Sequence, residues 1–325
     1  MTVVASRHAW LTWIVRAVAA AGVGVVVWAC STGWGAVVHG HPAFAVLLGL
    51  TVLGSGLVLW RSLRPRNPRQ GRHVVLDLVL VVVGVGWVAV MAWLRPFVAV
   101  EPALTAMVSD TDVTVTETAT RVELAPAGGM NAGGTAVFFQ PGAKVEARAY
   151  AAVLRPLAEA GHTVVIAKQP LGVAFLATGA FDDARAQYPD ADRWVVGGHS
   201  LGGVVASTQA DAADVNGADA ADGAAPAVGL LLYASYPSGD VRVSLTAAVE
   251  SVSGSEDGLS TPDKVAASRA RLPAESTFTV VDGAIHAFFG DYGPQPGDGI
   301  SAISHGEARS QISSASTQFV DSLSR

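Results

Sequence analysis

The residues best suited to chemistry surround Ser200, in the run Gly198–Gly202 with sequence GHSLG. This run matches the pattern G-x-S-x-G. It lies between a β-rich segment, Arg193–Val196, and a segment rich in small residues, Ser200–Ala213, that is typical of a helix. In such a tight strand-to-helix turn the serine side chain is exposed and its neighbours must be small. The start of the helix offers backbone N–H groups to a developing negative charge. The pattern predicts a nucleophilic serine.

A serine hydroxyl needs a base, and His286 is the histidine best placed to serve. It follows the last predicted strand, Ser276–Val281, and precedes a helical C-terminal segment. His199 adjoins the serine, but successive residues in this turn point apart, so we expect it to pack beside the site. His162 ends a predicted helix far from the strand ends, and we expect His305 to cap the final helix.

The base needs an acid that holds its tautomer, and Asp257 is the leading candidate. It lies in the loop Gly254–Gly258, directly after the predicted strand Leu245–Val252. Loops that follow parallel strands gather at the carboxyl edge of a sheet, where active sites form. Glu256 is the adjacent alternative, and Asp282 is expected to be solvated. The chain order of serine, acid and histidine is the one found in α/β-hydrolases.

Two backbone N–H groups are expected to form an oxyanion hole. The first is that of Leu201, directly after the serine. The second comes from the loop after the predicted strand Thr135–Phe139, at Ala143 or Gly142, with Ala143 preferred. Losing one such donor typically adds about 3 kcal/mol to the barrier. The chemistry of these residues requires no metal ion and no organic cofactor.

Residues 130–325 resemble the α/β-hydrolase superfamily, most closely its small, lidless bacterial branch labelled "alpha/beta hydrolase fold-5", which is related to the dienelactone hydrolases. The resemblance implies a mostly parallel sheet with helices on both faces, no cap domain, and a triad of Ser200, Asp257 and His286. Relatives often have Gly-Gly where this chain has Gly142-Ala143. The segments that carry it are Phe139–Val145 (FQPGAKV), Gly197–Gly203, Ser255–Val265 and His286–Asp298 (HAFFGDYGPQPGD).

The turn Gly290–Asp298 has two open interpretations. It is either a rigid Gly/Pro turn that supports the histidine or a segment whose Asp291 or Tyr292 shapes the substrate site.

Alternating strand and helix patterns predict an α/β domain over residues 111–325. Only Ser235–Ser244 separates two successive strands, which is too short for a lid, so we expect an open site. The predicted strands are Thr111–Thr118, Arg121–Leu124, Thr135–Phe139, Thr163–Ala167, Arg193–Val196, Val228–Tyr233, Leu245–Val252 and Ser276–Val281; the predicted helices are Glu146–Glu159, Phe175–Gln187, Ser200–Ala213, Pro262–Arg271 and a tail from about Ile303.

Residues 1–96 predict a membrane segment with three transmembrane helices, at about 10–30, 42–60 and 74–94. Each apolar run has roughly the 20 residues that cross a bilayer, and Trp residues sit near the ends of the runs. Residues 97–110 are expected to be a linker. One alternative is that residues 1–30 are a cleaved signal peptide, and the bulky Trp28 near the cut fits that poorly.

The distribution of charged residues predicts how the membrane segment is oriented across the bilayer. The loop at residues 61–73 holds five Arg, whereas residues 31–41 hold no Lys, Arg, Asp or Glu. The positive-inside rule therefore makes the 61–73 loop and the N-terminus cytoplasmic, and three crossings place residues 97–325 outside. Residues 97–325 carry 13 basic and 26 acidic side chains, which argues against nucleic-acid binding. The single Cys30 excludes an intrachain disulfide.

Together these patterns predict a membrane-anchored serine hydrolase at the cell membrane, acting on a small-molecule or lipid-like carboxylic ester through an acyl-enzyme. Two alternatives remain open: acyl transfer to an envelope acceptor by the same triad, and a catalytically idle hydrolase fold that serves as a binding or sensing domain. The sequence does not reveal the natural substrate, the acyl length or the oligomeric state.

Overall fold

A computed structural model describes residues 9–64, 71–129, 134–215 and 224–324. It divides into two compact units. One comprises residues up to Val38 and Pro42–Arg95, and the other comprises His39–His41 and Pro96–Arg325.

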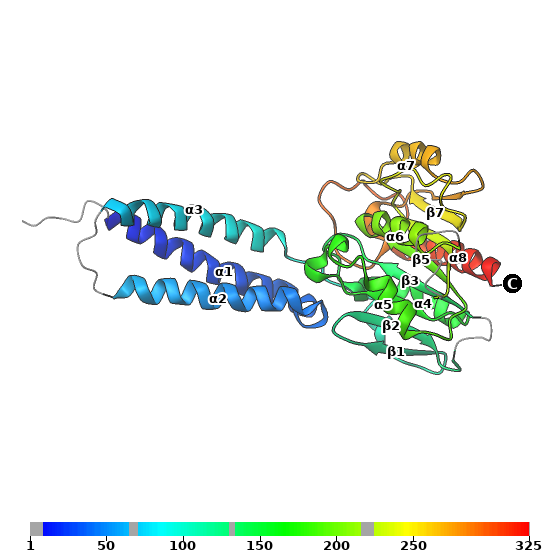
Figure 1. The fold of residues 1–325 in the computed structure, drawn as a ribbon, viewed down its shortest axis with the longest axis horizontal. Coiled ribbons are helices and arrows are strands. Elements are labelled where there is room, and N and C mark those ends of the chain that lie inside the picture. The colour runs from blue at the N-terminus through cyan, green and yellow to red at the C-terminus, as the bar shows by residue number, and fades with distance from the viewer. Residues whose placement is uncertain (1–8, 65–70, 130–133, 216–223, 325) are drawn as a thin grey trace, which may run out of the picture. The chain divides into compact units, whose positions relative to one another are not determined.

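The first unit is helical. It contains α1 (Ala9–His39), α2 (Pro42–Leu63) and α3 (Gly71–Trp93), and α1 is kinked at Gly33 (Figure 1). Most large side chains on these helices are apolar, and many are exposed, including Trp13, Leu53 and Val82. Exposed apolar helices of this kind are typical of chains in contact with lipid.

Two helices of the described chain are long and apolar enough to span a membrane, Trp10–His39 and Pro42–Leu63. Three such helices were predicted, and two meet this criterion among the described residues. The third predicted run falls in α3, of which the apolar stretch Asp77–Trp93 is shorter.

Polar side chains join the three helices within this unit. The Trp87 indole N–H of α3 donates to Thr51 Oγ1 of α2 at 2.9 Å, and the Arg16 guanidinium of α1 donates to the Ser62 carbonyl of α2 at 2.7 Å. A Cβ added at Gly22 would clash with the Ser55 hydroxyl, so a glycine allows α1 and α2 to approach closely.

The second unit contains one eight-stranded sheet with the order β1-β2-β4-β3-β5-β6-β7-β8. The pairs β1–β2 and β2–β4 are antiparallel and all the others are parallel. The predicted hairpin and mostly parallel sheet are confirmed. The strands are β1 (Val113–Glu117), β2 (Arg121–Pro126), β3 (Thr135–Gln140), β4 (Val164–Ala167), β5 (Arg193–His199), β6 (Ala227–Tyr233), β7 (Ala248–Gly254) and β8 (Thr277–Val281).

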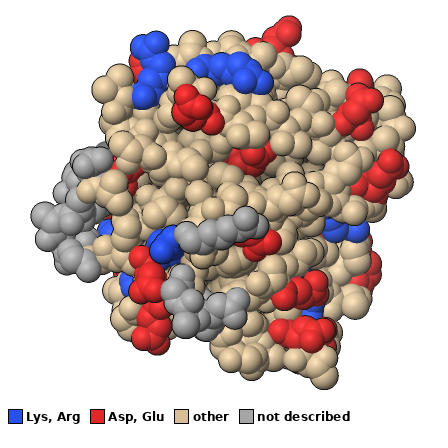
Figure 2. All heavy atoms as spheres, turned by 90° about the vertical axis from the view of Figure 1, so that its right-hand side faces the viewer, with Lys and Arg blue, Asp and Glu red and all other residues tan. Residues whose placement is uncertain are grey.

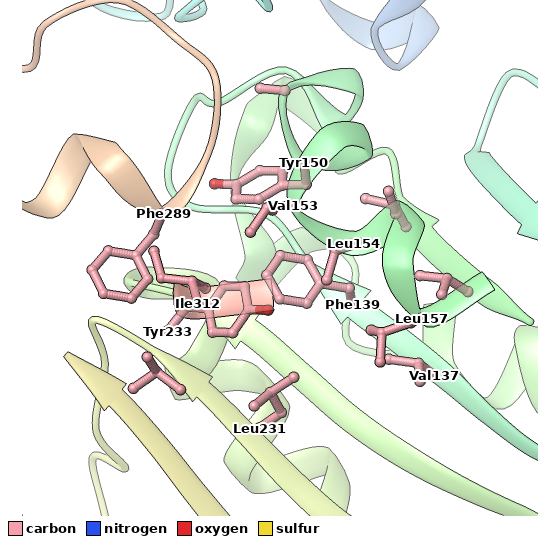
Figure 3. Close-up of a cluster of buried hydrophobic side chains, with 14 of the residues drawn as sticks. Val137, Phe139, Tyr150, Val153, Leu154, Leu157, Leu231, Tyr233, Phe289 and Ile312 are labelled. Atoms are coloured by element: carbon pink, nitrogen blue, oxygen red, sulfur yellow. The ribbon is translucent and has the colours of Figure 1, made fainter. Parts of the chain in front are cut away.

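Helices cover both faces of the sheet because alternate strand residues point to opposite faces. Val137 and Phe139 of β3 pack with α4 (Ala151–Glu159) and α8 (His305–Leu323), as Figure 3 shows. Ala136 and Phe138 of the same strand pack with α5 (Ala180–Gln187) and α6 (Leu201–Ala212) on the other face. The remaining helix is α7 (Pro262–Ser268), and short 3-10 turns include η2 (Ala147–Tyr150), η4 (Ala174–Leu176) and η7 (His286–Phe289).

Several predicted boundaries shift. The helix expected from Phe175 begins at Ala180, after η4, and the strand expected from Leu245 begins at Ala248. The first shift reflects Gly179, which precedes α5 and costs helix stability in an interior position. Residues 234–247, all described, connect β6 to β7 without a helix or strand, so this connection carries no cap domain.

Residues 97–110, predicted as a linker, are bound to the sheet domain. The Phe97 N–H donates to the Lys144 carbonyl at 2.7 Å, and the Glu146 N–H donates to the Phe97 carbonyl at 3.0 Å. The Arg155 side chain bonds the carbonyls of Ala106 and Val108 in the same segment. Elsewhere on the surface, acidic side chains are scattered over the face that Figure 2 shows.

Candidate functional site

Ser200 occupies a strained turn between β5 and α6. Its backbone has φ 52° and ψ −122°, a positive φ that costs energy in a residue with a side chain. The Ser200 N–H donates to the Tyr233 carbonyl at 3.0 Å, which holds the turn on the neighbouring strand. A Cβ at Gly198 would lie 2.5 Å from the Gly202 carbonyl carbon, and one at Gly202 would clash with Gln140. The small neighbours expected from the sequence are therefore required by space.

Ser235, in the loop directly after β6, holds this turn in place. Its hydroxyl donates to the Ser200 carbonyl at 2.6 Å, and a Cβ at Gly203 would meet the Ser235 side chain. Ser235 follows Ala234, whose φ is 44°, directly after β6. The sequence analysis missed this contact, because no local pattern marks a serine that packs against a turn 35 residues away.

Asp257 and His286 form a buried pair. Asp257 Oδ2 lies 2.8 Å from His286 Nδ1. Asp257 Oδ1 accepts from the N–H groups of Leu259 at 2.8 Å and Ser260 at 2.7 Å. A carboxylate oxygen that accepts from His286 places the imidazole proton on Nδ1. This leaves Nε2 as the basic nitrogen of His286.

The two alternative acids are directed elsewhere. Glu256 and Asp282 are both exposed, and the Ser255 hydroxyl donates to Glu256 Oε1 at 3.4 Å and to Asp282 Oδ1 at 3.0 Å. Neither contacts His286. The structure thus brings Asp257 to the histidine and leaves both rivals at the surface.

Asp298 braces the backbone around this pair. Its carboxylate accepts from the N–H groups of His286 at 3.0 Å and Ala287 at 2.8 Å. It also accepts from Gly258, next to Asp257, at 3.3 Å. One side chain therefore ties the acid loop to the histidine loop. This gives the end of the Gly290–Asp298 segment a supporting role that the sequence analysis did not assign to any residue.

Two further residues of that segment, Asp291 and Tyr292, point into the domain. Asp291 is buried and accepts from Arg309 of α8, with the Nη2–Oδ1 distance at 2.5 Å. The buried Tyr292 donates its hydroxyl to Gln295 Oε1 at 3.1 Å. These contacts favour the interpretation of a rigid supporting turn.

His286 lies against the residue that precedes the serine. The rings of His199 and His286 have centroids 4.5 Å apart, which places His286 beside the Ser200 turn. His286 Nε2 is buried and has no hydrogen-bond partner within the described residues. A buried basic nitrogen without a partner next to a serine turn is suited to accept a proton from a nucleophile.

His199 belongs to a separate hydrogen-bond chain. The Gly142 N–H donates to the Tyr150 hydroxyl at 2.8 Å, and that hydroxyl lies 2.8 Å from His199 Nδ1. The Tyr150 proton is thus directed to His199. Burial, followed by the nearby His286, lowers the pKa of His199 well below 6.5, and the His286 backbone acts in the opposite direction. His199 is a neutral packing group, as the sequence analysis expected.

The same chain bears on the oxyanion donors. Because Tyr150 already takes the Gly142 N–H, that donor is not free for a substrate. The Ala143 N–H has no partner among the described residues, and Gly202, beside Leu201, packs against Gln140 and Pro141. The arrangement favours Ala143 over Gly142 as the partner of Leu201.

Three glutamines brace the loop that carries Ala143. Gln169 Nε2 donates to Gln140 Oε1 and to the Pro141 carbonyl, each at 2.9 Å. Gln140 Nε2 in turn donates to Gln209 Oε1 at 3.3 Å. All three side chains are buried. Hydrogen bonds from buried amides fix the backbone that they contact, and no sequence pattern marks Gln169 or Gln209.

The remaining histidines lie outside this arrangement. His162 Nε2 contacts Asp321 Oδ1 at 2.9 Å, and the His305 ring stacks on Phe288 with centroids 4.5 Å apart. The helix cap expected at His305 belongs to Ser304, whose hydroxyl accepts from the Glu307 N–H. Across the described part of the chain, no three His, Cys, Asp or Glu side chains gather to hold a metal ion.

Comparisons with known proteins agree with this architecture. Residues 136–310 match the sequence profile of the alpha/beta hydrolase family. A comparison with curated proteins finds no match. Family membership rests on the profile match, since the structural similarities below are at low sequence identity.

Three similar solved structures illustrate the likeness. Propionate-bound esterase Est2 of Thermogutta terrifontis is 15% identical, with 66% of this chain and 94% of that chain covered and a TM-score of 0.44. Esterase B of Lactobacillus rhamnosis is 14% identical, with 76% of this chain and 96% of that chain covered and a TM-score of 0.48. The monoacylglycerol lipase of Paleococcus ferrophilus is 14% identical, with 62% of this chain and 99% of that chain covered and a TM-score of 0.42.

Replacing the bracing carboxylate tests its role. We expect Asp298→Ala to lower the free energy of unfolding by about 1–3 kcal/mol, because several backbone N–H groups lose an ionised acceptor. Denaturant unfolding of the full chain measures the change. The matched control is the exposed Asp190→Ala, for which we expect less than about 0.5 kcal/mol. Equal effects of the two substitutions would contradict the bracing role.

The depressed pKa of His199 predicts an acid-dependent loss of stability. Below about pH 6.5 the unfolded chain binds a proton at this residue while the folded chain does not. Stability is therefore complete above that pH and falls as pH drops, by up to about 1.4 kcal/mol per pH unit for one proton. His199→Gln keeps an acceptor for Tyr150 and removes this proton. Comparing unfolding free energies at pH 7 and pH 5 should show a shallower fall in the variant; parallel falls would refute the assignment.

Proposed function

We propose that this chain, which belongs to the alpha/beta hydrolase family, is a serine hydrolase that cleaves carboxylic esters. The observation that carries the proposal is the buried Asp257–His286 pair beside a serine in a strained strand-to-helix turn. This combination supplies a nucleophile, a base and a group that orients the base.

The proposed reaction has two halves. Ser200 Oγ attacks the ester carbonyl while His286 Nε2 takes the hydroxyl proton, and the Ala143 and Leu201 N–H groups bind the oxyanion. The alcohol then leaves with the proton from His286, and an acyl-enzyme remains. Water attacks that ester, gives its proton to His286, and the carboxylic acid is released as Ser200 regains the proton. Asp257 stays ionised and holds the imidazole throughout.

The range of substrates follows from the open connection after β6. Because residues 234–247 form no cap, the site can admit varied small-molecule or lipid-like esters, at the cost of excluding water poorly. No cofactor takes part in the proposed reaction.

The proposed location is a membrane surface. The long apolar helices Trp10–His39 and Pro42–Leu63 support an anchor. We further propose that α3, 23 residues long, also crosses, since 23 residues of helix extend about 35 Å. With the Arg-rich 61–73 loop inside, the N-terminus is cytoplasmic and the hydrolase domain is extracytoplasmic.

Ester hydrolysis by the full chain tests the activity. We expect Ser200→Ala to lower kcat/KM for p-nitrophenyl acetate by at least roughly 10³-fold and Asp257→Asn by roughly 10⁴-fold through the wrong imidazole tautomer. Asp282→Asn, a matched change at an exposed carboxylate, should stay within about twofold of the parent. Activity that survives Ser200→Ala would contradict the proposal. Added alcohols that divert the acyl group to new esters would instead indicate acyl transfer.

Cysteine labelling in intact cells tests the orientation. In a Cys30→Ser background, Val243→Cys places a thiol at a side chain that is 92% exposed in the second unit, and Asn67→Cys places one in the Arg-rich loop. A membrane-impermeant maleimide should label position 243 before permeabilisation and position 67 only after it. The reverse order would place the hydrolase domain in the cytoplasm with α3 still crossing, and labelling of both positions under the same condition would mean that α3 does not cross.

A further inference from the structure

An apolar groove lies between η4–α5 and α6, the helix that begins at the serine turn. It encloses about 250 Å³, slightly less than a pocket for a drug-sized molecule. One wall consists of Phe175, Thr178 and Phe181, and the other consists of Val205, Thr208 and Ala212.

The α6 wall begins one helical turn beyond Leu201, whose N–H is a proposed oxyanion donor. Val205, Thr208 and Ala212 recur at helical spacing and therefore share one face of α6. Leu201, the residue after the nucleophile, lies one turn before Val205 on that face and is half-buried. At 1.5 Å per residue, Thr208 lies about 12 Å along the helix from Ser200.

The opposite wall is held beside the loop that carries Ala143. Phe175 and its neighbour Leu176 are each 56% exposed, so two adjacent large apolar side chains lie at the surface here. Their segment is fixed at both ends. The Lys144 N–H donates to the Gly172 carbonyl at 2.7 Å, and Gln140 Nε2 donates to the Ala177 carbonyl at 3.2 Å.

The groove has a closed floor and a charged far side. Phe181 is buried, with its ring centroid 5.3 Å from that of Phe138 in the core. Asp182 also lines the groove and pairs with Arg185 at 2.8 Å. An apolar chain gains no binding free energy beside an ion pair that must stay hydrated. The Asp182–Arg185 pair therefore limits how long a chain the groove can bind.

We propose that this groove binds the acyl chain of the substrate, and that the enzyme selects esters of unbranched, medium-length fatty acids. The inference rests on the proposed ester hydrolysis at Ser200. With the carbonyl carbon at Ser200, the chain passes Leu201 and runs along α6 between Phe175 and Thr208. Each methylene that it buries strengthens binding about fourfold, so the preference grows with chain length until the groove is full.

Filling the groove is the direct test. Thr208 is exposed, so Thr208→Trp blocks the groove without disturbing the core. The matched control is Thr114→Trp, at an exposed position on β1. Full-length protein in lipid nanodiscs is assayed with p-nitrophenyl acetate and p-nitrophenyl octanoate. We expect the parent to prefer octanoate, Thr208→Trp to lower kcat/KM for octanoate at least tenfold with acetate within twofold, and Thr114→Trp to change neither.

A second variant removes an apolar wall instead of filling the space. Phe175→Ala should lower the octanoate-to-acetate ratio of kcat/KM by about three- to tenfold, mainly through KM. An active parent whose ratio is unchanged in both variants would overturn the groove assignment and leave ester hydrolysis standing.

A crosslinking measurement keeps the groove testable even if no ester is hydrolysed, the result that would contradict the proposed function itself. An octanoate ester with a diazirine at the terminal carbon is photolysed with the Ser200→Ala protein. Crosslinks within residues 175–182 or 205–212 are expected, and crosslinks found only elsewhere would refute the groove.

Discussion

The structure depends on one steric constraint, the absence of room for side chains where β5 meets α6. Gly198, Gly202 and Gly203 each face backbone or side-chain atoms where a Cβ would have to lie. This close approach brings the start of α6 against the loop after β3, and it leaves Ser200 at φ 52°. The strained conformation persists because hydrogen bonds hold Ser200 on both sides. Its N–H donates to the Tyr233 carbonyl, and its carbonyl accepts from the Ser235 hydroxyl.

Around that turn, polar side chains hold the loops at the carboxyl edge of the sheet together. Asp298 joins the loops of Asp257 and His286, and Gln169 joins the loop of Pro141 to its neighbour. Tyr150 connects the same loop to His199. Each loop at the carboxyl edge is thus fixed from below by hydrogen bonds. A site fixed in this way can remain open above and still hold its groups within the tolerances that catalysis requires.

The same hydrogen-bonded loops relate the proposed catalytic groups at the carboxyl edge of the sheet to the groove that is proposed to bind the acyl chain. The segment that bears Phe175 is bonded to the loop that bears Ala143, so the apolar wall of the groove and the proposed oxyanion donor keep a fixed distance from each other. The aromatic side chains beneath them, Tyr150, Phe139 and Tyr233, pack with ring centroids 5.0 and 5.3 Å apart (Figure 3). The core of the sheet therefore extends without interruption to the candidate site.

The sequence by itself determined what depends on local pattern. The alternation of strands and helices indicated the parallel sheet, and the glycines around Ser200 indicated the turn, because both signals lie within a few neighbouring residues. Chain order placed Asp257 and His286 after successive strands, and parallel strands end at one edge. The apolar runs indicated the three N-terminal helices, and two of them are long and apolar enough to span a membrane within the described residues.

The tertiary structure alone decided which side chains meet across long separations. Asp257 and Glu256 are adjacent in sequence, and only the direction of the loop sends one to His286 and the other to solvent. Ser235, Gln169 and Gln209 carry no motif, because a hydrogen bond between residues 28 to 69 positions apart leaves no periodic pattern in the sequence. Local sequence patterns specified the helices and strands, whereas the packing of loops at the edge of the sheet decided which side chains form hydrogen bonds with each other.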